Sequence, residues 1–192
     1  GVVQRSYGGD IMLSAEDITV RVNSGRKTIL QDISLTVYPG EFVGLMGPSG
    51  AGKTTLMMAL NGYLPPTQGH TRLNGVDLYR SYDSFRGNIG YVPQDDIIHS
   101  QLTVWEALYY TARLRLPPDT SRREICAIID RVLRELEISE TRDVLIGSPE
   151  DKGISGGQRK RVNLAQELIT QPSLLLLDEP TSGLASEDTL NV

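Results

Sequence analysis

A glycine-rich stretch, Gly47-Pro48-Ser49-Gly50-Ala51-Gly52-Lys53-Thr54, contains the residue types that hold phosphate groups. It matches the pattern G-x-x-x-x-G-K-T. Glycines at this spacing let consecutive backbone N–H groups surround phosphate oxygens, and a following helix directs its positive N-terminal end at the same anion. Lys53 is expected to reach the β- and γ-phosphates, and Thr54 to offer its hydroxyl to a phosphate-bound Mg²⁺. The alternative interpretation is a flexible glycine turn.

On the first interpretation, the nucleotide contacts come from nine consecutive residues. They are Gly47, Pro48, Ser49, Gly50, Ala51, Gly52, Lys53, Thr54 and Thr55.

A pair of carboxylates, Asp178 and Glu179, follows the uninterrupted apolar run Leu174–Leu177 and precedes a proline. This pattern is typical of a central parallel strand that delivers two carboxylates to the carboxyl edge of a sheet, where phosphate loops also emerge. Asp178 suits the water shell of Mg²⁺, and Glu179 can polarise an attacking water, because phosphoryl transfer depends mainly on positioning and charge neutralisation. Helix capping or a surface location is the alternative for this pair.

A second glycine-containing stretch, Ile154–Arg161, leads into the helical segment 162–169. Ser155 and Gln158 have capping-box spacing, so a helix with exposed N–H groups and a positive end is expected to begin here. Gly156 and Gly157 allow a phosphate to approach the backbone closely. A chain that binds one nucleotide seldom needs a second anion-binding helix start. The simplest use of this second helix start is to face the nucleotide bound by another subunit.

Short alternating apolar segments predict the strands that position these residues. A strand–turn–strand is expected over 11–22 and 28–37, a strand buried on both faces at Glu41–Met46, a hairpin around Asn74-Gly75, and a strand at Ile89–Val92. The phosphate loop should emerge from the carboxyl end of the strand at Glu41–Met46.

From about residue 97 to 150 the apolar period becomes helical, which predicts an inserted helical lobe. Thr103 with Glu106, and Ser121 with Glu124, form capping-box patterns that open two helices. Both helices are expected to belong to the core. The arginines in this stretch are interpreted as solvated charges rather than a binding patch; they are Arg113, Arg115, Arg122 and Arg123.

Length and composition narrow the function classes. A chain of 192 residues can bury about 70% of its unfolded surface, enough for a full core. The balance of 19 basic and 24 acidic residues gives a net charge of −5, which argues against general nucleic-acid binding. Cys126 is the single cysteine, so a disulfide framework is not available and a reducing setting fits. No stretch has the apolar length of a membrane span.

In these motifs the chain resembles the ATP-binding cassette of ABC transporters. Gly47–Thr54 matches the Walker A motif and Gln94 the Q-loop. Ile154–Gln158 matches the signature, Leu174–Glu179 the Walker B motif, and Ser182–Ala185 the D-loop. A glycine before the signature and an Arg-Lys-Arg-Val run after it resemble most closely the G (White) subfamily and its bacterial relatives.

The resemblance implies an α/β P-loop NTPase core with a mainly parallel sheet, an N-terminal antiparallel β subdomain and the helical lobe. Residues 1–10 are expected to be a linker, and 11–192 the ATP-binding domain. It also implies Mg²⁺ at Thr54, Gln94 and Asp178, with Glu179, Lys53 and Gln94 as catalytic residues. Two cassettes then pair head to tail, so that each ATP lies between one Walker A motif and Ser155, Gly156, Gly157 and Gln158 of the other.

The implied partners are a second cassette, identical or different, and a transmembrane domain, fused or separate, at the cytoplasmic face of a membrane. A soluble ABC ATPase acting on ribosomes or DNA, and a non-catalytic nucleotide-binding regulator, remain as alternatives. Retention of Lys53 and Glu179 argues against the regulator. The transported substrate and its direction do not follow from these residues.

Three positions depart from the family pattern. Val22 stands where an aromatic residue that stacks on adenine is expected, and the nearby Tyr7 and Tyr38 lack its position. Ala185 replaces the D-loop aspartate. The switch histidine is expected beyond Val192, since both histidines of this sequence precede the signature.

Overall fold

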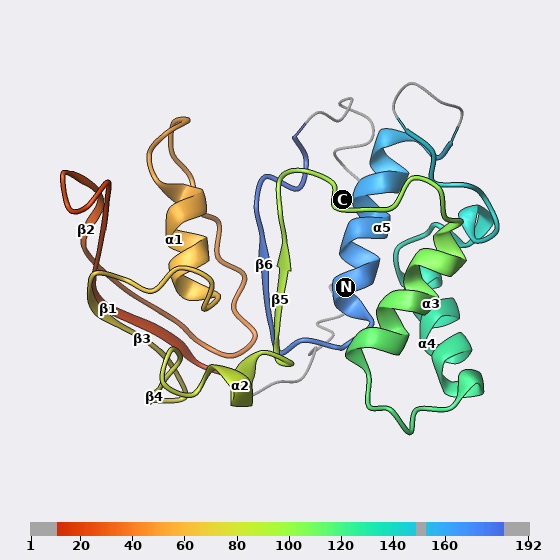
Figure 1. Cartoon of the computed structure of the whole chain (residues 1–192), viewed down its shortest axis with the longest axis horizontal. Helices are drawn as coiled ribbons and strands as arrows, with labels where there is room; N and C mark the ends of the chain where they lie inside the picture. Colours follow the sequence, from red (N-terminus) through yellow and green to blue (C-terminus); the bar gives the residue numbers. More distant parts are fainter. Residues whose placement is uncertain (1–10, 149–152, 183–192) are drawn as a thin grey trace, which may run out of the picture. The chain divides into compact units, whose positions relative to one another are not determined.

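The computed structural model describes residues 11–148 and 153–182, and the chain divides into two compact units. The first comprises residues 1–90 and 172–176, and the second 91–171 and 177–192. Figure 1 labels the elements of both units. The phosphate loop belongs to the first unit, and the signature, Gln94 and both carboxylates belong to the second.

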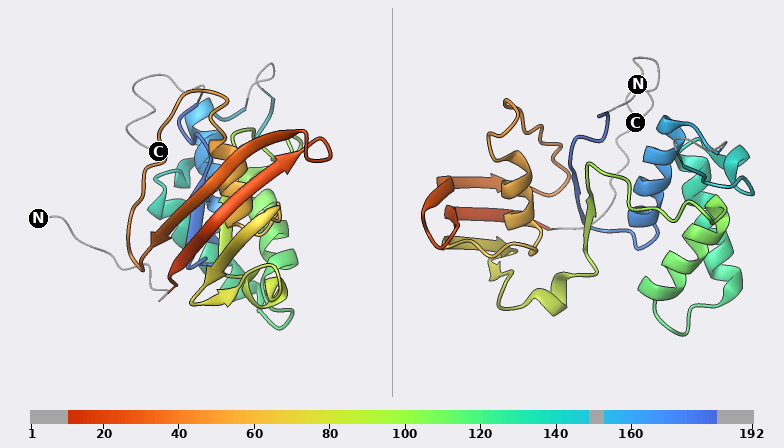
Figure 2. Two further views of the ribbon diagram at one scale, coloured as in Figure 1. Left: turned by 90° about the vertical axis from the view of Figure 1, so that its left-hand side faces the viewer. Right: turned by 45° about the horizontal axis from the view of Figure 1, so that its top comes forward.

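The first unit contains a four-stranded antiparallel sheet with the order β2-β1-β3-β4. Its strands are β1 (Leu13–Val22), β2 (Lys27–Val37), β3 (Gln68–Leu73) and β4 (Val76–Asp77). Figure 2 shows β1 and β2 as two long neighbouring ribbons. The predicted antiparallel subdomain is therefore confirmed.

The predicted hairpin at Asn74-Gly75 is also confirmed. Both residues have positive φ, 49° and 80°, as the two central positions of a type I′ turn require. Asn74 also donates its backbone N–H to the Met12 carbonyl, and its side-chain oxygen accepts from the Met12 N–H. The turn thus ties the strand ends of β1 and β3 together.

Helix α1 (Lys53–Leu60) directly follows the phosphate loop and lies beside the antiparallel sheet (Figure 1). It buries Leu56, Ala59 and Leu60. Thr71 of β3 donates its hydroxyl to the Ala59 carbonyl at 2.9 Å in a fully buried contact. The sheet therefore anchors the far end of the helix whose near end carries the loop.

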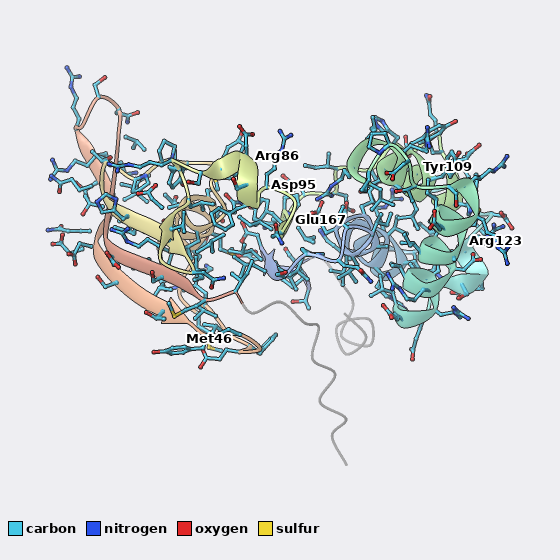
Figure 3. The ribbon with its side chains drawn as sticks, turned by 90° about the horizontal axis from the view of Figure 1, so that it is seen from below. Met46, Arg86, Asp95, Tyr109, Arg123 and Glu167 are labelled. Carbon is cyan, nitrogen blue, oxygen red and sulfur yellow. The ribbon has the colours of Figure 1, made fainter. Side chains whose placement is uncertain are left out.

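The prediction of a buried strand at Glu41–Met46 is wrong. These residues form no strand, and the side chains of Phe42 and Met46 are 96% and 91% exposed. Figure 3 shows Met46 on a loop outside the strands. A parallel strand needs neighbours on its hydrogen-bonding edges. The described sheet of this unit gives the segment none, so apolar composition alone does not make it a strand.

Strands β5 (Ile89–Val92) and β6 (Leu174–Leu177) form a second, two-stranded sheet. The Leu174 N–H donates to the Asn88 carbonyl in the first unit, and the Asp178 N–H to the Val92 carbonyl in the second. Partner numbers rise together, so the strands are parallel. Leu176 is the buried residue of β6, and its three other leucines are partly buried.

The second unit is built on helices α3 (Val104–Arg115), α4 (Arg122–Glu135) and α5 (Gly156–Leu168), with the short 3₁₀ turn Ser139–Thr141. The first unit also has a short helix, α2 (Tyr82–Phe85). One hydrophobic core joins the three long helices, and α5 contributes Val162 and Ala165 to it, followed by Ile169 just after the helix. The core of the helical lobe thus extends beyond the predicted range 97–150.

Both predicted capping boxes in the lobe are present. Thr103 accepts from the Glu106 N–H and Ser121 from the Glu124 N–H, each with the reciprocal side-chain bond. Hydrogen bonds from the backbone and hydroxyl of Thr103 lower the pKa of Glu106. Helices α3 and α4 therefore begin at residues that the sequence identifies.

Candidate functional site

The phosphate loop has a backbone that glycine makes possible. Gly50 and Gly52 adopt φ of 78° and 92°, a region that side chains rarely occupy. A Cβ on Gly52 would also lie 3.0 Å from the Leu30 side chain and 3.3 Å from that of Ile29. The glycine spacing recognised in the sequence therefore has a steric cause as well as a role in phosphate approach.

Lys53, the first residue of α1, lies over the loop that precedes it. Its ammonium donates to the carbonyls of Gly47 at 3.0 Å and Pro48 at 3.2 Å. The first turn of α1 has no acidic residue, so the partial positive charge of the helix end is not offset by its own side chains. Thr54 is exposed in the same turn and Thr55 is half-buried. This end of α1 suits an anion.

Tyr79 locks the other end of α1. Its phenol donates to the carbonyls of Ala59 at 3.0 Å and Leu64 at 2.5 Å. Burial raises the pKa of Tyr79 above its usual range, so the phenol stays protonated and remains a donor. The helix is held at its carboxyl end, and its amino end is left to the loop.

In the second unit, β6 delivers the two predicted carboxylates in different environments. Asp178 is buried, with 2% of its surface exposed, and accepts from the Tyr91 hydroxyl at 3.3 Å. Burial, and then the negative charge of Asp178, raise the pKa of Tyr91 to about 12. Tyr91 therefore donates as a neutral phenol and fixes the orientation of the Asp178 carboxylate.

Glu179 is exposed and has φ of 48°, which is unusual for a residue with a long side chain. Such a conformation costs on the order of 1–3 kcal/mol and persists only where its surroundings enforce it. The Gln94 side-chain amide donates to Glu179 Oε2 at 3.0 Å. The structure thus brings together two of the three predicted catalytic residues, Gln94 and Glu179, within the second unit.

The predicted signature helix begins at Ser155, as expected. The Ser155 hydroxyl accepts from the Gln158 N–H at 3.2 Å, and Gln158 Oε1 accepts from the Ser155 N–H at 2.9 Å. The Gln158 amide also donates to Glu140 at 3.2 Å. Gly156 is exposed and Gly157 is buried. No acidic residue lies in the first turn of α5, so its positive end also suits an anion.

Gly153 explains why a glycine precedes the signature. A Cβ there would lie 2.1 Å from the Ile146 carbonyl oxygen, a distance that forces the backbone to move. Arg159 holds the same segment against the start of α5, because its guanidinium donates to the carbonyls of Gly147 at 2.7 Å and Ile146 at 3.2 Å. The start of α5 is therefore pressed against the segment at 146–147.

Several residues that position the site escaped the sequence interpretation. Arg115 was expected to be a solvated charge, but it forms a bidentate ion pair with Glu167 at 2.7 and 2.9 Å, and Glu167 accepts from the Tyr91 N–H. Lys160 was noticed only as part of a basic run. Lys160 lies one helical turn from the buried Gly157, and the residues of α5 after Gly156 are all buried or half-buried, so the helical spacing places its stem in the core.

The predicted Mg²⁺ ligands are divided between the units, with Thr54 in the first and Gln94 and Asp178 in the second. One hydroxyl, one amide and one carboxylate suit Mg²⁺, which keeps phosphate and water oxygens as its other ligands. Within residues 11–148 and 153–182, no three His, Cys, Asp or Glu side chains cluster as an all-protein metal site. The predicted D-loop residue Ala185, Tyr7 and the linker 1–10 lie outside the described residues.

A phosphate loop that opens a helix and a strand that ends in two carboxylates are the features of a P-loop NTPase. The glycine-containing start of α5 is a third feature that suits phosphate. The ABC transporter family model matches residues 30–182, and the chain belongs to this family. It is 52% identical over 160 residues to an ABC transporter ATP-binding/permease protein of Mycobacterium tuberculosis, covering 83% of this chain and 18% of that protein. ABC transporter G family member 14 of Arabidopsis thaliana is 49% identical over 164 residues, covering 85% and 25%.

A solved structure of cbiO1 from Clostridium perfringens, part of the ABC transporter complex cbiONQ, matches with a TM-score of 0.79 and 27% identity, over 95% of this chain and 70% of that one. The P-loop NTPase fold and the relation to the G family are thereby confirmed. The chain spans between 16% and 25% of the length of the curated relatives it matches. Within the described part of the chain, none of the helices has the length and apolar character of a membrane span.

Proposed function

We propose that this chain binds Mg-ATP on its phosphate loop and hydrolyses it as the motor domain of a transporter. Gly47–Thr55 bind the phosphates, Lys53 neutralises the β- and γ-phosphate charge, and Thr54, Gln94 and Asp178 hold Mg²⁺ through oxygen ligands. Glu179 is the general base that takes a proton from the attacking water. When bound, Mg²⁺ would neutralise part of the phosphate charge.

The contact between Gln94 and Glu179 carries this proposal. A side-chain amide that donates to one carboxylate oxygen at 3.0 Å orients the carboxylate. Buried Asp178, one residue earlier on β6, has the fixed orientation that suits a metal ligand. The two carboxylates thus have environments that suit two different roles.

A second cassette, identical or different, completes the site. The N-terminus of α5 has two anion-binding features, a helix start and Gly156-Gly157, and we assign them to the γ-phosphate bound by the phosphate loop of the partner. The two cassettes close around the bound nucleotides, and a transmembrane domain, fused or separate, responds to this closure. This chain would then lie at the cytoplasmic face of a membrane. In this account, hydrolysis by an isolated copy is slow.

Nucleotide titration with and without Lys53 tests the phosphate-loop part of the proposal. Lys53→Met keeps the aliphatic length and removes the charge, so affinity for Mg-ATP should fall at least about tenfold, because a charge-assisted phosphate contact contributes roughly 1.5–3 kcal/mol. Lys27→Met, at an exposed lysine on β2 of the same unit, is the matched control and should bind like the original chain. Equal affinity of the Lys53 and Lys27 variants would remove Lys53 from the site.

A further inference from the structure

A cluster of polar contacts joins the segment after Gln94 to helix α5. The Lys160 ammonium donates to the Gln94 carbonyl and to Asp96 Oδ1, the latter at 3.1 Å. The Asn163 amide donates to the same Asp96 oxygen at 2.6 Å, and the Arg159 guanidinium lies 3.9 Å from the other oxygen. We call Asp96, Arg159, Lys160 and Asn163 the Asp96 clamp.

Burial makes the clamp more than a surface ion pair. The Lys160 side chain is 10% exposed and that of Asp96 is 26% exposed. Among the described residues, Lys160 and Asp178 are the buried charged side chains. Asp96 lies at the surface, so Lys160 is the buried member of the pair. Removing the partner of a buried charge is unfavourable because it leaves that charge uncompensated, so the contacts of Lys160 are closely held.

The clamp connects two parts of the proposed site. On one side it holds the main chain of Gln94, whose side chain is bonded to Glu179. On the other it holds the second turn of α5, whose first residues follow the Ser155 cap. We propose that Asp96 and Lys160 are positioning residues that fix Gln94 against Glu179 and against the signature helix. This inference rests on the proposed ATPase function.

The first experiment is steady-state ATP hydrolysis by Lys160→Met, with the active fraction counted by nucleotide stoichiometry. The value of kcat per active site should fall about tenfold to a hundredfold, as expected when a reacting group is misplaced by about 1 Å. KM for ATP should change less than kcat, since the phosphate loop, which makes the phosphate contacts, contains none of the clamp residues. Lys160→Arg keeps the charge and the donors and should restore most of the rate.

A double-mutant cycle separates positioning from general damage. Asp96→Asn and Lys160→Met each break the pair, whereas the double variant removes both charges and leaves none uncompensated. Its kcat should therefore be no lower than that of the poorer single variant. Arg134→Met is the control, because Arg134 is exposed and its side chain donates, within the part of the chain that the structure describes, to the Asp130 carbonyl of its own helix.

Amide hydrogen exchange measures the clamp without hydrolysis. In Lys160→Met, the hydrogen-bonded amides at 159–163 of α5 should exchange at least about tenfold faster than in the original chain, and residues 53–60 at an unchanged rate. Unchanged exchange at 159–163, or a full kcat per active site in Lys160→Met, would overturn the inference. If Glu179→Gln hydrolyses normally, the proposed function fails. If Glu179→Gln loses turnover but the clamp variants hydrolyse ATP normally, the proposed function stands and only the positioning role of the clamp is refuted.

Discussion

Two helices in this chain begin at glycine-rich stretches, and they begin in opposite ways. Helix α1 starts at Gly52, which has φ of 92° and no side-chain cap, whereas α5 starts at Ser155 in an extended conformation with a complete capping box. Neither first turn contains an acidic residue. Both ends suit anions, but only α5 satisfies part of its own backbone with its own side chains.

The difference indicates how the two helix starts are prepared for phosphate. Around α5, Arg159 donates to the carbonyls of Ile146 and Gly147, and Lys160 to that of Gln94, so three separate backbone points fix its first turns. Around α1, Lys53 bonds its own loop, in which residues 47–51 are all exposed and Gly52, at the helix start, is half-buried. We infer that the signature is preorganised, whereas the phosphate loop reaches its binding geometry with the nucleotide.

The largest expected effect separates chemistry from binding. In Glu179→Gln the side chain keeps its shape and its contact with Gln94 but loses the base, so kcat should fall about 10²–10⁴-fold. ATP affinity should stay within about twofold, because the proposed phosphate contacts come from Gly47–Thr55 and the amide keeps the shape of the carboxylate. Phosphate-release assays and nucleotide titration measure the two quantities. Near-normal turnover would refute the assignment of Glu179 as the base.

A substitution at Gly153 should disturb the preorganised helix start. The Cβ of Gly153→Ala would lie 2.1 Å from the Ile146 carbonyl oxygen, so the free energy of unfolding should fall by about 1–3 kcal/mol, as for other overpacked sites. Gly87→Ala is the control, since an added Cβ there meets nothing within 4 Å and its φ is not positive. Chemical denaturation of the two variants gives the comparison, and equal stabilities would contradict the close contact.

The smallest expected difference is that between the affinities for ATP and GTP. Stacking of a base on an aromatic ring contributes roughly 1–3 kcal/mol in nucleic-acid systems, and Val22 cannot provide it. ATP and GTP should therefore bind within about tenfold of each other. Tyr38, just after β2 and 57% exposed, offers the control Tyr38→Leu. A strong preference for ATP that Tyr38→Leu removes would show that this tyrosine supplies the ring.

The sequence predicted the elements that local chemistry determines. Capping boxes at Thr103, Ser121 and Ser155, and the turn at Asn74-Gly75, each depend on residues within four positions of one another, and the structure has all of them. The strand predicted at Glu41–Met46 failed because a parallel strand depends on distant neighbours.

The supporting contacts of the site were not predictable for the same reason. Asp96 and Lys160 are 64 positions apart in the sequence, and Tyr91 and Asp178 are 87 apart. Nothing local to either residue of a pair identifies the other. Glu179 could be assigned from the strand-end carboxylate pair, but recognising Gln94 required the family resemblance, because a glutamine in a loop has no distinctive pattern of its own.

The claim that the signature of one copy completes the phosphate site of another can be tested by mixing two inactive variants. Lys53→Met disables the phosphate loop and leaves the signature intact. Ser155→Asp leaves the phosphate loop intact and still caps α5, because aspartate is a favoured N-cap residue, but its charge repels the γ-phosphate. Ser155→Asn, a cap without charge, is the matched control and should retain more activity.

In a head-to-tail pair of the two variants, one site combines the intact phosphate loop with the intact signature, and the other combines both defects. Each variant alone should hydrolyse ATP slowly, and their equimolar mixture should recover a rate several-fold above the sum of the two. A mixture whose rate equals that sum at every protein concentration would contradict the account, because it would show that no site is shared between copies.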